Sequence, residues 1–320
     1  MSRMAAPTSL RVATYNLYVG ADLALLFDVS DLDELPTQAA VVRGQLDATR
    51  FAERATAVAA MFARERPDVV GLQEVCRWTS TPIGADGVAG AERVVVDFLP
   101  TLLDALESAG CGYDVHAVNE NFGGAMPISA SESVGLTGAN VTLVRRDDRL
   151  DVVGERTSAY TASHQVVTGI DGLRFAIARS WGSVDLRVDG HPLRFVNTHT
   201  EAYDARVRGA QRDELLAHNA DDSMPVVVVG DFNATPDAVG MPAPYLDAWA
   251  VAGTGDGFTW GQATDLANEL SLLRERIDYV WAAGADVRDC RVIGGRPDDR
   301  THPHRLWQSD HACVLADLAF

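Results

Sequence analysis

The sequence predicts a fold that combines many β-strands with a few α-helices. Apolar, β-branched runs recur from the beginning of the chain to its end, and such runs are typical of strands. Helical spacing appears between some of them, and no repeat or long linker divides the 320 residues. We therefore expect one domain over residues 1–320, with residues 1–9 as a flexible N-terminus. The expected strands lie within residues 10–19, 68–75, 140–146, 192–200, 225–233, 276–282 and 311–320.

The clearest helix candidate lies within residues 49–67, where apolar side chains recur at helical spacing and Pro67 follows the end. Residues 91–109 and 204–219 are the second and third helix candidates. The four consecutive valines at 226–229 indicate a strand that is buried on both faces.

Three segments between these elements are long. Residues 76–90 and 119–138 are rich in Gly, Ser and Thr, and we expect loops there, which in a compact domain are usually functional. Residues 20–48 form an insertion between the first strand and the first helix. This insertion follows the first polar motif directly, so it could line a substrate pocket.

Composition excludes several chemistries. The net charge is −18, and all 27 basic residues are arginine, so neither a P-loop lysine nor a Schiff-base lysine is present. Because non-specific nucleic-acid binding depends on basic contacts to phosphates, this acidity disfavours extensive nucleic-acid binding. The four cysteines form no zinc-binding pattern, and we interpret them as buried apolar residues: Cys76, Cys111, Cys290 and Cys313.

No apolar run approaches the roughly 18 residues that a transmembrane helix needs. The N-terminal segment also lacks a long apolar stretch before the first strand. We therefore expect a cytoplasmic protein, or a secreted one if a signal segment has been removed.

Polar side chains cluster where the expected strands end. Carboxylates, amides and imidazoles follow apolar runs in six places: Asn16 in TYN, Glu74 in LQEV, His199 in VNTH, Asp231 and Asn233 in GDFN, Asp278 in RIDY, and Asp310 and His311 in SDH. Each of these residues alone is more often a turn, a cap or a structural residue. The whole ordered series argues for a site.

The residue types suit phosphoryl chemistry. Glu74 and Asn16 offer the hard oxygen ligands that Mg²⁺ prefers. Asp231 and Asn233 lie two residues apart on an apparently extended chain, so they should point to the same side. Histidines can act as a base or stabilise developing charge, and Asp278 can orient one of them.

The ordered series resembles the endonuclease/exonuclease/phosphatase superfamily, which includes deoxyribonuclease I, abasic-site endonucleases, neutral sphingomyelinases and inositol polyphosphate 5-phosphatases. The motifs that carry the resemblance are TYN, LQEV, VNTHTEA, VVVVGDFNATP, RIDYVW and SDHACVLADL, which span residues 11–320. The resemblance implies an α+β fold, namely a four-layer αββα sandwich of two mainly antiparallel sheets flanked by helices.

The resemblance also implies roles. Glu74, Asn16 and Asp310 would hold Mg²⁺, with Mn²⁺ as a substitute, and Asn16 would also face the substrate. The catalytic set would be His199, Asp231, Asn233, Asp278 and His311. Residues 113–145 should supply a phosphate-side residue; Asn140 is the candidate, with Asn119, Asn121, Arg145 and Arg146 as alternatives.

The predicted function is metal-dependent hydrolysis of a P–O bond, with a phosphorylated small molecule or lipid as substrate. A nuclease would need a row of arginines, but Arg43, Arg50, Arg54 and Arg64 are spaced as on the solvated face of a helix. A sphingomyelinase-like phospholipase would need an exposed apolar element, for which residues 23–27 could serve, although packing against the first helix is an alternative. A non-catalytic binding module is disfavoured because the motif set is complete.

Overall fold

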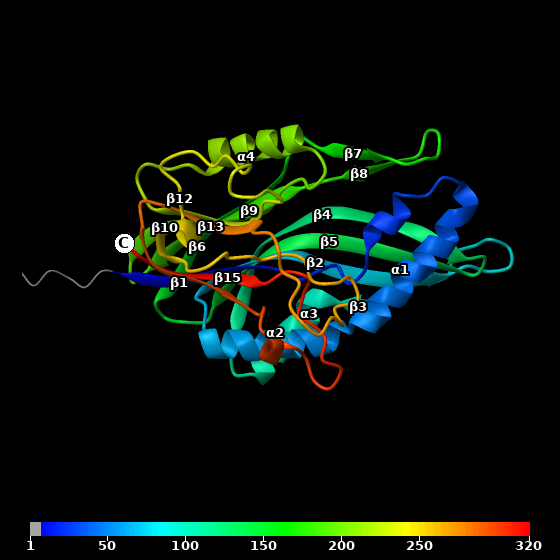
Figure 1. Cartoon of the computed structure of the whole chain (residues 1–320), viewed down its shortest axis with the longest axis horizontal. Helices are drawn as coiled ribbons and strands as arrows, with labels where there is room; N and C mark the ends of the chain where they lie inside the picture. The colour runs from blue at the N-terminus through cyan, green and yellow to red at the C-terminus, as the bar shows by residue number, and fades with distance from the viewer. Residues whose placement is uncertain (1–7) are drawn as a thin grey trace, which may run out of the picture.

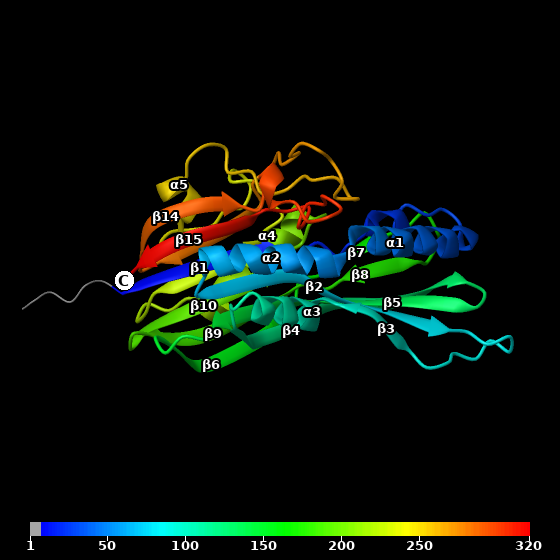
Figure 2. The same cartoon turned by 90° about the horizontal axis from the view of Figure 1, so that it is seen from below.

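The structure is a computed structural model that describes residues 8–320. Two β-sheets pack face to face, and helices cover their outer faces (Figures 1 and 2). This is the predicted α+β four-layer sandwich. Of the expected flexible segment 1–9, residues 1–7 lie outside the described residues, and Ser9 already belongs to the first strand.

The first sheet has the strand order β14-β15-β1-β2-β5-β4, with β3 paired to β2. β1 and β2 run parallel, and the other described pairs of this sheet are antiparallel. Its strands are β1 (Ser9–Asn16), β2 (Val69–Pro82), β3 (Arg93–Asp97), β4 (Tyr113–Ser129), β5 (Glu132–Arg145), β14 (Asp286–Ile293) and β15 (Cys313–Ala319).

The second sheet has the order β12-β13-β11-β10-β9-β6, and here β10 and β11 form the parallel pair. A separate hairpin of β7 and β8 lies beside it. The strands are β6 (Leu150–Ala159), β7 (His164–Val167), β8 (Arg174–Ile177), β9 (Ser180–Val188), β10 (His191–His199), β11 (Val226–Asp231), β12 (Leu246–Asp247) and β13 (Asp278–Ala283).

Helices α2 (Phe51–Glu65) and α3 (Phe98–Ser108) cover the first sheet, whereas α4 (Ala205–Asn219) covers the second (Figure 1). The buried face of α2 repeats at helical spacing through Phe51, Ala55, Val58 and Phe62. Burial of each large side chain contributes about 1.5–3 kcal/mol. The remaining elements are α1 (Leu35–Thr49), α5 (Ala248–Ala252) and the 3₁₀ turns η1 (Leu23–Leu26), η2 (Leu32–Glu34) and η3 (Pro297–Asp299). In the described part of the chain, no helix combines the length and apolarity that a membrane crossing requires.

The interface between the sheets contains a narrow polar seam. Gln73 donates to Asn197 Oδ1 at 2.7 Å and to the Thr14 hydroxyl at 3.0 Å. Asn197 in turn donates to the carbonyls of Leu72 and Val141. These bonds between strands of different sheets fix how the sheets sit on each other, so motif-bearing strands of both sheets end at one common edge.

Several expected elements differ from the structure. The apolar run at 226–229 is buried on both faces as expected, and the helices near 49–67 and 204–219 are present. Residues 91–109, expected as one helix, divide into β3 and α3, because the β-branched run Val94–Val96 pairs with β2.

The expected loop at 119–138 is almost entirely strand, whereas the one at 76–90 is strand up to Pro82 and mostly turn beyond it. β2 extends to Pro82, and β4 and β5 form a long hairpin across residues 113–145. The glycines of this hairpin allow close packing and are not a sign of flexibility, since a Cβ on Gly138 would lie 2.4 Å from the Phe122 ring. The sequence also did not predict α1 inside the 20–48 insertion.

Candidate active site

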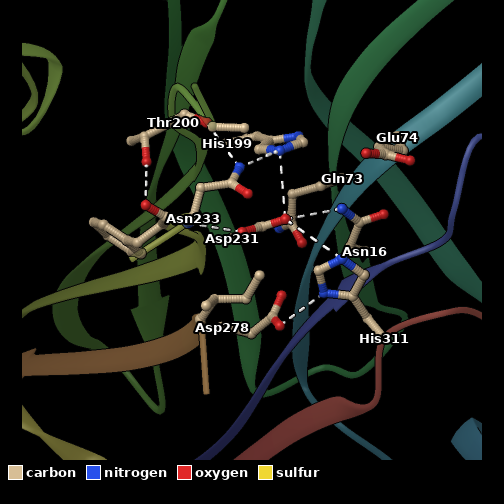
Figure 3. A network of polar contacts seen from close by, with 12 residues as sticks. Asn16, Gln73, Glu74, His199, Thr200, Asp231, Asn233, Asp278 and His311 are labelled. Carbon is tan, nitrogen blue, oxygen red and sulfur yellow. Dashed lines mark hydrogen bonds and ion pairs between the residues drawn. The ribbon is translucent and has the colours of Figure 1, made fainter. Parts of the chain in front are cut away.

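Strand register brings three of the motif residues side by side. His199 ends β10, Asp231 ends β11 and Asp278 begins β13, and the pairing aligns His199 with Asp231 and Asp231 with Asp278. Asn16 reaches the same edge from the end of β1, and His311 does so from just before β15. The site is thus built from both sheets and from both ends of the chain (Figure 3).

The GDFN motif depends on unusual backbone geometry. Gly230 has a φ of 152°, and a Cβ there would lie 2.0 Å from the Thr198 carbonyl oxygen, so only glycine fits. Asn233 has a left-handed φ of 48°, and its backbone N–H donates to Asp231 Oδ1 at 2.9 Å. The two side chains therefore converge through a turn, not through the extended alternation that the sequence suggested, because β11 ends at Asp231.

Asp231 lies at the centre of the polar network (Figure 3). Its Oδ2 accepts a hydrogen bond from Asn16 Nδ2 at 3.0 Å. The same oxygen lies 3.4 Å from His199 Nε2 and 3.7 Å from His311 Nε2. Asn233 Nδ2 is 3.0 Å from His199 Nε2. One carboxylate thus faces two imidazoles and two amides.

The two histidines have opposite electrostatic environments. Burial lowers the pKa of His199 well below its ordinary value, and the charges of Arg179 and His311 act in the same direction. Burial opposes the charged form of His311 too, but the carboxylates of Asp278, Asp310 and Asp231 raise its pKa well above the ordinary value. His311 Nδ1 lies 2.8 Å from Asp278 Oδ2. His199 is therefore neutral and His311 is an imidazolium.

Asp231 itself is a weakened acid. Burial and the negative charge of Asp278 raise its pKa to about 7, against the opposing effect of His311. A carboxylate with a pKa near neutrality can accept a proton at physiological pH. This property suits a group that activates water.

Arg179 is a residue that the sequence did not identify. It is 8% exposed, its Nη1 lies 3.2 Å from each ring nitrogen of His199, and its Nε has no hydrogen-bond partner among residues 8–320. In the sequence this arginine lies within the run FAIARSW (175–181), which we did not predict to form a strand. The alternatives Arg145 and Arg146 instead pair with acidic residues away from this edge, namely Asp68 and Asp147, and Glu107 and Asp114, respectively.

The predicted substrate contact Asn140 lies in a buried polar cluster. It donates to the Ser180 carbonyl at 3.1 Å and accepts from Asn121 Nδ2 at 2.9 Å. Asn119 and Asn121 also bond to the Ser180 hydroxyl. The cluster anchors the beginning of β9, next to Arg179, and direct contact of Asn140 with substrate stays a prediction.

Glu74 and Asp310, two of the predicted cation ligands, line the same cavity. Glu74 has a left-handed φ of 55° at an irregularity in β2, and its Oε2 accepts from the Val19 N–H at 2.6 Å. Burial raises the pKa of Asp310 to about 6, and the negative charge of Glu74 adds to this rise. A divalent cation would relieve that repulsion, and two carboxylates with the nearby Asn16 are the donors that Mg²⁺ prefers.

A second acidic group lies deeper. Asp231, Asp278 and His311 offer ligand atoms within 4.8 Å of one another, and all three are buried. Nδ1 of His311 already lies 2.8 Å from Asp278 Oδ2, so this ring nitrogen is engaged by a carboxylate. This contact favours proton chemistry for the group, and Glu74, Asp310 and Asn16 as cation ligands stay a prediction.

A cavity of about 450 Å³ opens beside the polar network. Glu74, Arg179, Asp231 and His311 line one end, and mostly apolar side chains line the rest. The 20–48 insertion contributes Leu23, Leu26, Phe27, Ala39 and Val42, so this insertion does line a pocket as the sequence suggested.

Known proteins share this architecture. Truncated TDP2 of Caenorhabditis elegans is 18% identical, with a TM-score of 0.59 and 98% of each chain covered. A Bacteroides vulgatus endonuclease/exonuclease/phosphatase protein is 19% identical, with a TM-score of 0.60 and coverage of 97% of this chain and 98% of its own. The mannosyl-6-phosphatase of Bacteroides thetaiotaomicron is 17% identical, with a TM-score of 0.58 and coverage of 97% and 100%.

Among curated proteins no sequence match is found. The model of the endonuclease/exonuclease/phosphatase family, however, matches residues 13–311, which include all the motif residues from Asn16 to His311. The chain belongs to the endonuclease/exonuclease/phosphatase family.

Proposed function

We propose that this protein is a divalent-metal-dependent phosphodiesterase that acts on a small-molecule or lipid phosphodiester. Family membership makes the chain a phosphoesterase in general terms. The observation that carries the finer proposal is the position of Asp231, which lies within 3.7 Å of one neutral and one charged histidine and lines a mostly apolar cavity.

In this proposal Asp231 holds the attacking water and accepts its proton. A pKa of about 7 lets the carboxylate be ionised and still basic near neutral pH. Asn16 Nδ2 and the Asn233 N–H, which donate to the two carboxylate oxygens, fix its orientation. The proton transfer thus begins from a pre-organised group.

The cationic and amide groups face the phosphate. His311, charged and held by Asp278, can donate Nε2–H to a phosphoryl oxygen. Arg179 has an Nε–H without a partner among residues 8–320. Asn233 Nδ2 donates to the Thr200 carbonyl and lies 3.0 Å from His199 Nε2, so its amide would have to release one of these contacts to reach the phosphate. These donors stabilise the negative charge that develops in the transition state, which is the main requirement of phosphoryl transfer.

We assign Glu74, Asp310 and Asn16 to the cation, as Mg²⁺ or Mn²⁺. When bound there, the cation would neutralise phosphate charge as a Lewis acid. The fit rests on two carboxylates that line the same cavity, where burial and, to a smaller extent, the charge of Glu74 raise the pKa of Asp310.

Hydrolysis of bis-p-nitrophenyl phosphate tests the proposal. We expect turnover with Mg²⁺, loss of turnover in EDTA and recovery on addition of Mg²⁺ or Mn²⁺. Glu74→Ala should lower both activity and metal affinity, whereas the exposed Glu120→Ala should do neither. Full activity in EDTA would reject the metal dependence. A panel of plasmid DNA, RNA, sphingomyelin, inositol phosphates and nucleotide diesters then ranks the substrate classes.

A further inference from the structure

The apolar wall of the cavity is built by side chains that have no part in the polar network. Leu26 and Phe27 follow the first strand, Phe122 and Leu136 lie on the β4–β5 hairpin, and Phe175 lies on β8. Figure 1 shows α1, the β7–β8 hairpin and the β4–β5 hairpin extending together at one end of the molecule. Separate segments of the polypeptide therefore form the apolar wall, next to the groups that we propose face the phosphate.

Aromatic contacts join these segments across the wall. The rings of Phe27 and Phe175 lie 5.2 Å apart, and those of Phe27 and Tyr203 lie 6.2 Å apart at right angles. Tyr203 remains 57% exposed. Leu23 and Leu26 pack partly against the core, and both line the cavity together with Phe27.

The chemistry of the wall selects a class of ligand. Among residues 8–320, Arg179 is the sole arginine that lines the cavity, and it lies at the catalytic end. A nucleic acid, a sugar phosphate or an inositol polyphosphate would need more cations or hydrogen-bond donors, because buried polar groups without partners are costly. An apolar cavity of this size instead suits a hydrocarbon group.

We propose that the substrate is an amphiphilic phosphoester whose phosphate lies against His311 and Arg179 and whose single hydrocarbon chain occupies the apolar cavity. This inference rests on the proposed function, since the same site performs the hydrolysis. Water attacks phosphorus, the P–O bond to one organic group breaks, and that group leaves as an alcohol after it gains a proton.

Binding of alkylphosphonates tests the cavity without catalysis. Calorimetry with methyl-, butyl-, octyl- and dodecylphosphonate, with Mg²⁺ and again in EDTA, should show affinity that rises with chain length. Full burial of each methylene is worth up to about a fourfold gain. The heat-capacity change should become more negative in parallel. Equal affinity for methyl- and octylphosphonate would overturn the proposal.

A matched pair of variants tests where the hydrocarbon chain of the ligand binds. Ala125 lines the cavity from β4, whereas Val118 on the same strand is 47% exposed and does not contribute to the wall. Ala125→Phe should fill the cavity and lower the octyl-to-methyl affinity ratio at least tenfold, and Val118→Phe should keep the wild-type ratio. An unchanged octyl-to-methyl affinity ratio in a well-folded Ala125→Phe protein would place the hydrocarbon chain outside this cavity and overturn the assignment.

Hydrolysis of p-nitrophenyl alkyl phosphates separates the two proposals. If the methyl ester is cleaved and longer esters are not preferred, the inference fails while the phosphodiesterase function stands. If phosphonate affinity rises with chain length but no diester is cleaved, the proposed function fails. Octyl esters supplied as monomers and in phosphatidylcholine vesicles distinguish a dispersed substrate from one taken out of a bilayer.

Discussion

At the scale of single residues, the site depends on one carboxylate between two differently charged imidazoles. Desolvation makes His199 neutral, whereas three carboxylates make His311 positive. Neither state follows from the residue type, because an isolated histidine titrates near neutrality. The environment that assigns the states comes from both sheets, so the division of labour is a property of the fold.

We expect the two histidines to act as one unit. His199→Ala and His311→Ala should each lower kcat by on the order of 10²–10⁴, the range for a positioned acid–base group. The double variant should cost much less than the product of the two, because groups that act together are non-additive. Asp278→Asn should resemble loss of His311. Steady-state kinetics on one diester, with KM compared to kcat, measures this.

His191→Ala provides the matched control, since His191 begins the same strand β10 but is exposed. Its kcat should equal that of the wild type. Circular dichroism checks that every variant is folded. Near wild-type turnover in a folded His199→Ala or His311→Ala protein would remove that histidine from the mechanism.

At the scale of elements, helix α2 holds two loops that flank the site, one near each end of the polypeptide. Arg54 is fully buried and donates to the carbonyls of Leu17 at 2.6 Å, Gln308 at 2.9 Å and Thr49 at 2.9 Å. Burial lowers its pKa to about 10, which still leaves it charged. Arg54 thus ties the segment after Asn16 to the segment before His311. The sequence placed Arg54 on a solvated face; this is wrong, because the loops on either side of the site need its donors.

Arg54→Met should therefore destabilise the protein strongly. It leaves several buried carbonyls without donors, and each such loss costs about 1–3 kcal/mol. We expect a total loss on the order of 3 kcal/mol or more in the free energy of unfolding, measured by urea denaturation. Arg64→Met on the same helix should change it by less than about 1 kcal/mol, since Arg64 is 57% exposed and forms surface ion pairs. Similar losses in both variants would contradict the assigned role.

Glu53 on α2 should make stability depend on pH. Burial opposes its ionisation, but hydrogen bonds from Thr301 and His304 lower its pKa below the ordinary 4.5. A lowered folded-state pKa contributes stability above the unfolded pKa, and this contribution is lost as pH falls through the folded value. Glu53→Gln should thus destabilise most above pH 4.5 and least once the pH has fallen below the folded pKa of Glu53.

The measurement is urea denaturation of wild type and Glu53→Gln from pH 3 to pH 7. Glu120→Gln, an exposed carboxylate on β4, serves as the control and should give a small difference at every pH. A difference for Glu53→Gln that stays constant with pH would show that the Glu53 charge does not hold the 301–304 segment.

Elements also show where sequence reasoning stops. Buried strands such as β11 were predictable because four valines have no other reasonable environment. The β4–β5 hairpin was not, because residues such as Gly123, Gly124 and Gly138 carry no apolar periodicity and are held by pairing across the hairpin. Arg179 was missed for the same reason, since its partner His199 is brought close only by the pairing of β9 with β10. Motif residues at strand ends could be named from order alone, but their distances and charges could not.

At the scale of the whole molecule, the two sheets supply complementary parts of the site. The first sheet and its flanking loops provide Asn16, Glu74 and His311, and the second provides His199 and Asp231. The polar seam of Gln73 and Asn197 keeps these halves aligned. A substitution that shifts one sheet relative to the other should therefore lower activity even when the protein stays folded.

The overall charge leads to the last prediction. The protein carries a net charge of −18. Of the arginines that could have formed a nucleic-acid groove, Arg54 is buried, Arg43 pairs with Asp47 and Arg64 pairs with Glu65. A protein that contacts 6–10 phosphates loses about 10³–10⁵ in affinity between 50 and 200 mM salt, because counterions are released. We expect no such behaviour here: fluorescence anisotropy with a duplex DNA should show weak binding and a shallow salt dependence. Hydrolysis of bis-p-nitrophenyl phosphate over the same salt range checks that the enzyme stays intact. Tight DNA binding that falls steeply with salt would show that a local basic groove outweighs the net charge, and it would favour a nuclease over a phosphodiesterase of amphiphilic substrates.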